Sequence, residues 1–341
     1  MRWTVLLLTA TALAAQTDPG RIRRATEFAR AGKWPEAETT LKGVEPPNAP
    51  GERIAFYRLR AEIASALGHN AAAASEMRAA LALAPSKADL LLATATAERR
   101  AGENQNAVEH LLALPKSPPN WTLIGELQNT IGDRDAALKS FAEAANLAAN
   151  EEAYRLRYAY ELARDEKFEA ARTILTDMRS PQGRTLLALI DYATGKDDEA
   201  AKALLEASDL ELDWAVPVEI LGELELRRDG APDSSAVDRV CLWADRTKEP
   251  HGQALCAALV LAAARSQSSK EAGDDILERL TEAAKAAPDD ATAQCALAQA
   301  SEWLNRKEAA AGSAERCALL RPKQEDRSAL ARRLIKEFAG K

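Results

Sequence analysis

WTLIGELQNTIGDRDAALKSFAEAANLA, residues 121–148, is the stretch that decides the fold of this 341-residue chain. Gly125 and Ala137 lack bulk at the points where two antiparallel helices would cross, so the two backbones can approach closely. Gly132 would end the first helix, because glycine accepts the left-handed conformation that a helix C-terminus often needs. The remaining space would be filled by the bulky residues Trp121, Ile124 and Phe141. The stretch therefore predicts one helical hairpin.

The same arrangement of a turn followed by an alanine recurs along the chain. A hairpin with one apolar face cannot bury that face alone and must stack on copies of itself. The alanines that follow the successive turns are Ala37, Ala73, Ala107, Ala137, Ala171, Ala200 and Ala310. Up to Ala200 they lie 36, 34, 30, 34 and 29 residues apart. Farther on, Pro288 and Pro322 are 34 residues apart and would close successive second helices.

In this spacing the chain resembles the tetratricopeptide-repeat family, whose unit is a helix-turn-helix of about 34 residues. In the copy quoted above the matching residues are Trp121, Ile124, Gly125, Ala137, Phe141 and Ala144. The copy around Ala73 matches at Tyr57, Ala61, Gly68, Ala73, Met77, Ala80 and Pro85, and the last copy at Ala298, Ala310, Cys317 and Pro322. The resemblance implies an all-α fold, a right-handed superhelical solenoid of stacked helix-turn-helix repeats.

Three segments are expected along the chain. Residues 1–15 read as a signal peptide, residues 16–322 as the repeat array, and residues 323–341 as a C-terminal capping helix. Within the array, residues 207–275 fit the repeat poorly and are interpreted as divergent repeats rather than a second domain. The final helix has Leu330, Leu334 and Phe338 on one face and cations on the other, which suits a solenoid cap. A helix on a membrane surface would look similar.

The N-terminus has the pattern of an export signal. Arg2 precedes an apolar run from Trp3 to Leu13, and small residues follow. The alternative is an uncleaved apolar helix. No cysteine follows that could carry a lipid, and no later segment approaches a membrane span. The sequence therefore predicts an exported protein, periplasmic or secreted and of bacterial type, without an integral membrane span once the signal is cleaved.

Export would permit disulfides between the four cysteines, all of which lie in the last third of the chain. Four cysteines allow three connectivities. Pairing Cys241 with Cys256 and Cys295 with Cys317 would join neighbouring antiparallel helices and is the favoured arrangement. Buried, reduced thiols are the alternative. No pair has the spacing of a zinc site, so no metal is expected.

The composition of the chain argues against nucleic-acid binding, and its lack of catalytic motifs argues against an enzyme. A net charge of -7 leaves no general affinity for nucleic-acid backbones, which needs clustered cations. The chain has neither a phosphate-binding glycine motif nor a nucleophile signature. Its three histidines, His69, His110 and His251, are interpreted as solvated or helix-capping residues. No catalytic residue and no cofactor is expected.

The resemblance implies a concave surface, lined by the first helix of each repeat, that binds peptides or extended partner segments. Projecting the repeat register onto the sequence predicts groove residues at Arg58, Glu62, Arg99, Arg100, Glu126, Asn129, Tyr160 and Arg164. Guanidinium groups form paired hydrogen bonds with carboxylates, so this surface could hold an acidic segment. The alternative is an ordinary solvated helix face. The lysine and asparagine clamp of some tetratricopeptide-repeat domains is not reproduced, so recognition of chaperone tails is not implied.

The leading functional hypothesis is a non-catalytic scaffold or adaptor of the cell envelope or a secreted compartment, with protein or peptide partners. One alternative is a chaperone-like holder of exported chains, which would need an open groove with exposed apolar residues. The other is a helical-repeat enzyme, which would need a pocket where titratable groups converge.

Overall fold

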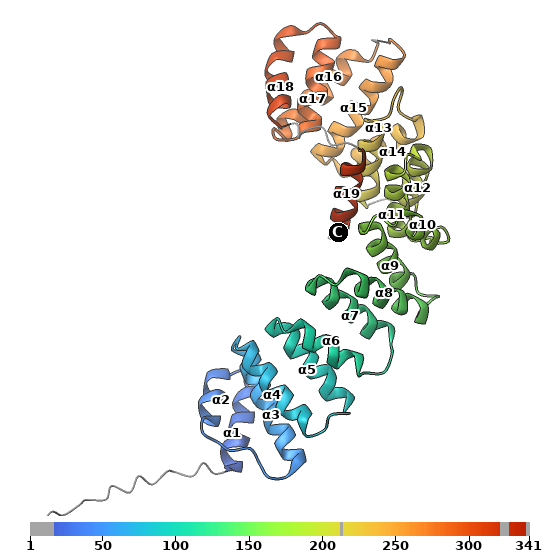
Figure 1. Cartoon of the computed structure of the whole chain (residues 1–341). Coiled ribbons are helices and arrows are strands. Elements are labelled where there is room, and N and C mark those ends of the chain that lie inside the picture. Colours follow the sequence, from blue (N-terminus) through green and yellow to red (C-terminus); the bar gives the residue numbers. More distant parts are fainter. Residues whose placement is uncertain (1–16, 212–213, 270, 321–326, 339–341) are drawn as a thin grey trace, which may run out of the picture. The chain divides into compact units, whose positions relative to one another are not determined.

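The protein is built from helices (Figure 1). The computed structural model describes residues 17–211, 214–269, 271–320 and 327–338. Over these residues the chain forms nineteen helices and no strand. Their bounds are α1 Pro19–Arg30, α2 Trp34–Leu41, α3 Pro50–Ala66, α4 Asn70–Ala82, α5 Ala88–Ala101, α6 Asn104–Leu112, α7 Pro118–Ile131, α8 Arg134–Leu147, α9 Glu152–Arg164, α10 Phe168–Leu175, α11 Pro181–Ala193, α12 Asp197–Leu210, α13 Ala215–Glu225, α14 Ser234–Thr247, α15 Pro250–Ser266, α16 Gly273–Ala286, α17 Ala291–Trp303, α18 Lys307–Leu320 and α19 Arg327–Phe338.

These helices belong to two compact units. Unit 1 ends at Leu147 and contains α1–α8, and unit 2 begins at Ala148 and contains α9–α19. Within each unit an odd-numbered helix pairs with the even-numbered helix that follows it, up to α18. We call the odd-numbered member the first helix of its hairpin. The prediction of an all-α fold of stacked helix-turn-helix units is confirmed. The bounds predicted for the repeat array, residues 16–322, stay a prediction.

The hairpin of α7 and α8 has the packing that the quoted stretch predicts. The hydroxyl of Ser117 caps α7 by accepting a hydrogen bond from the backbone N–H of Asn120, and Gly132 ends the helix with a φ of 93°. A Cβ atom placed on Gly125 would lie only 2.9 Å from the ring of Phe141, which is 1% exposed. Glycine at this crossing therefore makes room for the phenylalanine of the partner helix.

The core is a row of apolar clusters rather than one centre. In unit 1, one cluster joins α1, α2 and α3, a second joins α3, α4 and α5, and a third joins α5, α6 and α7. Alanines such as Ala37 and Ala107 are fully buried in these clusters, each in a second helix. Their small side chains allow close helix packing, as the alanine-rich composition suggests.

The poorly matching region around residues 207–275 contains helical hairpins. Its elongated turn spans residues 226–233 and joins α13 to α14. Arg228 fastens this turn through bonds of 2.8 Å to Asp198 on α12 and to Glu225 on α13. The carboxylate of Glu225, which is buried, also accepts the backbone N–H of Asp233. The turn is longer than in other hairpins, and these ionic contacts hold it in place.

All four cysteines form disulfides in the structure. Cys241 on α14 is bonded to Cys256 on α15, and Cys295 on α17 is bonded to Cys317 on α18. This is the favoured pairing of the sequence analysis, and each bond joins helices that follow one another in the chain. The alternative of four buried thiols is not what the structure contains.

The final described helix, α19, packs within unit 2, and its role as a cap stays a prediction. It packs mainly against α11 and α9 (Figure 1). Its buried residues are Leu330, Ala331 and Ile335. An apolar stripe requires only an apolar partner surface, and unit 2 offers one on its first helices. The predicted signal peptide and Pro322 lie outside the described residues.

Candidate peptide-binding surface

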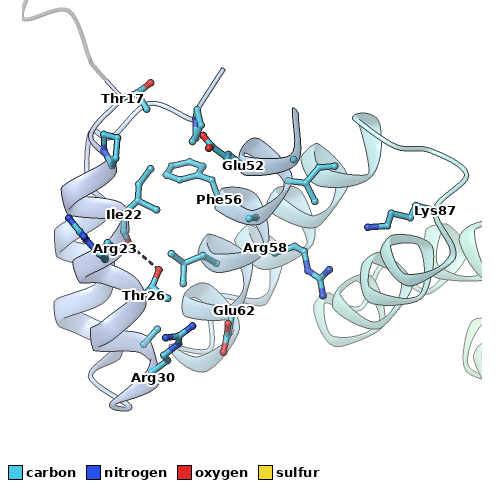
Figure 2. Close-up of a pocket in the computed structure, with 17 residues that line it drawn as sticks. Thr17, Ile22, Arg23, Thr26, Arg30, Glu52, Phe56, Arg58, Glu62 and Lys87 are labelled. Carbon is cyan, nitrogen blue, oxygen red and sulfur yellow. Dashed lines mark hydrogen bonds between the residues drawn. The ribbon is translucent and has the colours of Figure 1, made fainter. Parts of the chain in front are cut away.

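A pocket of about 900 Å³ opens on the first helices of unit 1 (Figure 2). It lies between α1 and α3 and extends to the start of α5 at Lys87. Figure 2 shows Thr26 and Arg30 on the side of α1 that faces α3, and Arg58 extending from α3 toward Lys87. We call this site the unit 1 pocket. Its volume is in the range of sites that bind small ligands or short peptide segments.

The floor of the unit 1 pocket is apolar. Phe56 is 1% exposed and belongs to the cluster that joins the first two hairpins, with Ile22 and Leu59 packed beside it. Pro50 starts α3 at a position where a missing backbone N–H costs nothing, and Phe56 follows on the second turn of the helix. The apolar surface that a ligand could contact here is therefore that of Ile22 and Leu59, which are only partly buried.

Cations outnumber carboxylates around this floor. The lining includes Arg23, Arg30, Arg58 and Lys87 against Glu52 and Glu62. Arg58 lies 3.2 Å and Lys87 3.6 Å from the carboxylate of Asp89, so one anion is shared by two cations. Arg23 and Arg30 are exposed and have no ion-pair partner in the part of the chain that the structure describes. The pocket therefore combines an apolar floor with uncompensated positive charge.

The structure distributes the predicted groove residues over both units. Arg58 and Glu62 line the unit 1 pocket. On α5, Arg99 is exposed, and Arg100 donates a hydrogen bond of 3.0 Å to the hydroxyl of Ser65 on α3. Glu126 and Asn129 are half-buried on α7. Their roles in binding stay predictions, and only the first two are brought together in one cavity.

The two predicted residues in unit 2 make contacts within the protein. Tyr160 is 7% exposed, so it offers little surface to a peptide. The guanidinium of Arg164 lies 5.7 Å from the centre of the Tyr160 ring and donates to the carboxylate of Glu161, 3.1 Å away. These contacts stabilise α9. They also mean that Arg164, which was predicted to bind a ligand, is already bonded within the protein.

The sequence analysis missed Arg23, Arg30 and Lys87. The repeat register was projected only from the copy that contains Arg58 onward, although the hairpin before it was recognised from Ala37. The signal was present in RIRRATEFAR, where Arg23 and Arg30 are seven residues apart and so share one face of a helix.

No protein-family model matches the sequence, and no curated protein is similar enough to count as a relative. Among solved structures, the C-terminal part of a TPR repeat-containing protein from Cytophaga hutchinsonii aligns with 80% of this chain and 97% of its own length, at 11% identity and a TM-score of 0.50. The chain has the tetratricopeptide-repeat fold. YrrB, described as a TPR protein with an unusual peptide-binding site, aligns with 57% of this chain and 96% of its own length, at 15% identity and a TM-score of 0.40. The Cut9-Hcn1 complex of the APC/C aligns with 93% of this chain and 83% of its own, at 12% identity and a TM-score of 0.40.

Polar groups inside this tetratricopeptide-repeat fold are paired between hairpins. Glu98 on α5 is fully buried, and its carboxylate lies 3.2 Å from Nη1 of Arg78 and 2.7 Å from Nδ1 of His110. Arg78 also bonds Glu103. His110 was interpreted from the sequence as a solvated or capping residue, but it satisfies a buried carboxylate. This network holds α4, α5 and α6 together.

His251 on α15 has a second polar role in unit 2. Its Nδ1 lies 2.6 Å from the carboxylate of Asp290, which also caps α17 by accepting the backbone N–H of Ala293. The hydrogen bond to Asp290 raises the pKa of His251, although partial burial opposes this. Burial works to raise the pKa of Asp290, but the bonds from His251 and Ala293 outweigh it and the pKa is lowered. Protonated His251 and ionised Asp290 are thus the favoured pair.

Unit 2 should lose stability relative to a His251→Gln variant as the pH rises from about 6 to about 8. A raised histidine pKa contributes stability that is present below the unfolded value of about 6.5 and is lost as the pH rises through the folded value. Because the ring is 38% exposed, we expect an effect of about 1 kcal/mol or less. Urea unfolding at a series of pH values measures it.

The matched control for this experiment is Asp290→Asn, which keeps an oxygen to cap α17 and removes the charge. Its pH profile should resemble that of His251→Gln. Glu219 and Glu223 on α13 also raise the pKa of His251. These three residues line a small pocket together with Arg333 and Glu337 on α19. Parallel profiles for the wild type and His251→Gln would contradict a role for the ion pair.

Over the described residues, no cluster of three or more histidine, cysteine or acidic side chains is arranged to hold a metal ion. In the same residues, no helix is both long enough and apolar enough to cross a bilayer.

Proposed function

We propose that the protein is a non-catalytic interaction scaffold that acts after export and binds acidic segments of partner proteins in the unit 1 pocket. The observation that carries this proposal is the presence of Arg23 and Arg30, without ion-pair partners among the described residues, beside the partly buried apolar side chains of Ile22 and Leu59. A segment that combines carboxylates with an apolar side chain would satisfy both features. Guanidinium groups suit carboxylates because they donate two parallel hydrogen bonds.

The N-terminal sequence pattern supports export, and so do the disulfides. Two disulfides in one chain fit an oxidising compartment such as the periplasm or the cell exterior. The repeat fold supports the scaffold role, since stacked hairpins expose a long surface of first helices. Together these features favour a protein that positions others over one that performs chemistry.

Fluorescence anisotropy with a synthetic peptide rich in glutamate and phenylalanine tests the proposal. We expect the double variant Arg23→Glu, Arg30→Glu to bind this peptide at least about tenfold more weakly than the wild type, a loss of about 1.4 kcal/mol. Binding by the wild type should weaken as salt is added, because exposed charges are screened. A matched peptide with lysine in place of glutamate should not bind.

The control variant is Arg24→Glu, Lys139→Glu, which changes the net charge equally. Arg24 is exposed on α1 outside the pocket lining, and Lys139 is exposed on α8. This variant should bind nearly as the wild type does. Equal losses in both variants would reduce the effect to overall charge, and equal binding of the two peptides would refute a preference for acidic segments.

A further inference from the structure

One of the two disulfides of unit 2 lies beside a cation. The bond between Cys241 and Cys256 joins α14 to α15, and Nη1 of Arg279 on α16 donates a hydrogen bond of 3.8 Å to Sγ of Cys256. Because α15 packs against both α14 and α16, the three residues meet at one place. A sulfur in a disulfide is neutral and accepts hydrogen bonds weakly. A thiolate at the same position would bind the charged guanidinium far more strongly.

The charge of Arg279 is not neutralised by a carboxylate. Asp275 lies four residues before it and Glu282 three residues after it on α16, at spacings where ion pairs commonly form on a helix. Within the described part of the chain, Arg279 nevertheless forms an ion pair with neither of them and with no other acidic side chain. Its positive charge is therefore free to act on the sulfur of Cys256.

The two cysteines of this disulfide differ in their access to solvent. Cys256 is 1% exposed, whereas Cys241 is half-buried and keeps part of its surface open. In thiol–disulfide exchange a thiolate attacks one of the two sulfurs, and the rate depends on access and on the stability of the departing thiolate. Attack at the more accessible Cys241 makes Cys256 the leaving group, which is the sulfur that Arg279 contacts. Exposure and charge therefore favour the same direction of attack.

The second disulfide lacks this arrangement. Cys295 and Cys317 are both half-buried, so access favours neither sulfur. Among the residues that the structure describes, no arginine or lysine donates a hydrogen bond to either of them. Arg316, next to Cys317 in the chain, donates instead to the carbonyl oxygen of Pro288. This disulfide joins two successive helices in the same way and is an internal reference for the first.

Contacts other than the disulfide also hold α14 against α15. The side-chain amide of Gln253 donates a hydrogen bond of 2.6 Å to the carbonyl oxygen of Ala244. Trp243 is 4% exposed and packs so closely over Gly252 that a Cβ atom there would collide with the indole ring. Neither contact involves a sulfur. The disulfide can therefore open while the two helices stay paired, although its loss lowers their stability.

We infer that the disulfide between Cys241 and Cys256 is a thiol–disulfide exchange site that accepts an external thiolate at Cys241. The bond between the two cysteines breaks as a bond forms between the external sulfur and Sγ of Cys241. The electron pair of the broken bond stays on Sγ of Cys256, beside Arg279. This site lies on α14, α15 and α16 and does not depend on the unit 1 pocket.

The product depends on the class of thiol. A monothiol stays attached to Cys241 until the thiolate of Cys256 attacks Cys241 and restores the original bond. The second thiolate of a dithiol instead attacks the external sulfur and releases Cys241, so the dithiol becomes a disulfide and gives two electrons to the protein. The protons that the dithiol loses on ionisation balance those that the two cysteines take up.

The first test locates the attacked sulfur and needs no variant. The full oxidised chain is incubated briefly with reduced glutathione, the reaction is stopped with iodoacetamide, and the cysteine peptides are identified by mass spectrometry. We expect glutathione on Cys241 and the alkyl group on Cys256. The reverse pattern, or the absence of glutathione from Cys241, overturns the proposal.

The second test compares the rates at which dithiothreitol reduces the two disulfides in the folded chain. The bond between Cys241 and Cys256 should be reduced at least about tenfold faster than the bond between Cys295 and Cys317. Arg279→Gln should slow only the first reaction, by at least about threefold, and Arg279→Lys should restore most of the rate because it keeps the charge.

The matched control is Lys285→Gln, which removes a cation from an exposed position of the same helix and should change neither rate. Because Arg279 is itself exposed, its variants are expected to fold, and circular dichroism checks this. Equal rates for the two disulfides in the wild type, or equal effects of Arg279→Gln and Lys285→Gln, overturn the proposal.

Discussion

Replacing Phe141 by alanine is expected to lower the free energy of unfolding of unit 1 by about 3–5 kcal/mol. The ring is 1% exposed and fills the space over Gly125, where no side chain of the partner helix can replace it. The cavity would lie in the middle of a close helix crossing, so the two backbones cannot easily collapse onto it. Urea unfolding followed by circular dichroism gives the change.

Two further variants give this prediction its controls. Lys139→Ala, on the exposed side of the same helix, should change the stability by less than about 0.5 kcal/mol. Gly125→Ala should also destabilise, since its Cβ atom would lie 2.9 Å from the Phe141 ring. If Phe141→Ala cost no more than Lys139→Ala, the glycine and the phenylalanine would not form the packing unit described here.

Reduction of the disulfides is expected to destabilise unit 2 and leave unit 1 unchanged. The bond between Cys241 and Cys256 closes a separation of 15 residues, and that between Cys295 and Cys317 one of 22 residues. A loop of about 15 residues gives a stabilisation of about 3 kcal/mol in the chain-entropy account. Unit 1 has no cysteine. Hydrogen exchange with and without a reducing agent resolves the two units in one sample.

The double variants Cys241→Ser, Cys256→Ser and Cys295→Ser, Cys317→Ser separate the two bonds. Each double variant should lower the stability of unit 2 under oxidising conditions. Adding a reducing agent should then lower the stability of each variant only through the disulfide that it retains. If the oxidised wild type contained four titratable thiols, or if reduction left exchange in unit 2 unaltered, the cross-links would be absent or without effect.

The hairpin fold was predictable because its determinants are local. Gly125, Gly132 and Phe141 act within one pair of helices, and the spacing between them is set by helix geometry alone. The cysteine pairing followed from the same local logic, since antiparallel neighbours bring residues on successive helices together. These features recur with each repeat, and their recurrence was visible in the sequence.

The features that distinguish one part of the chain from another were not predictable in this way. Every hairpin shares a similar pattern, so spacing could not reveal the division after Leu147. The apolar face of α19 was predicted, but an apolar face on one helix does not show which other helix it will contact. The long apolar segment of α11, which α19 contacts, did not by itself indicate that partner. Arg23 and Arg30 were missed because the register was not carried back to the first hairpin.

The contact between Arg332 and Glu166 joins residues that are 166 positions apart, in a fold whose other contacts are mostly between neighbours. In a plain stack of hairpins, each hairpin contacts only its neighbours, so opening can begin at one end and progress. α19 links the first helices of unit 2 to the end of the chain and thereby couples α9, α11 and α13. We therefore expect unit 2 to open in a more cooperative step than unit 1, in which no such link is found among the described residues.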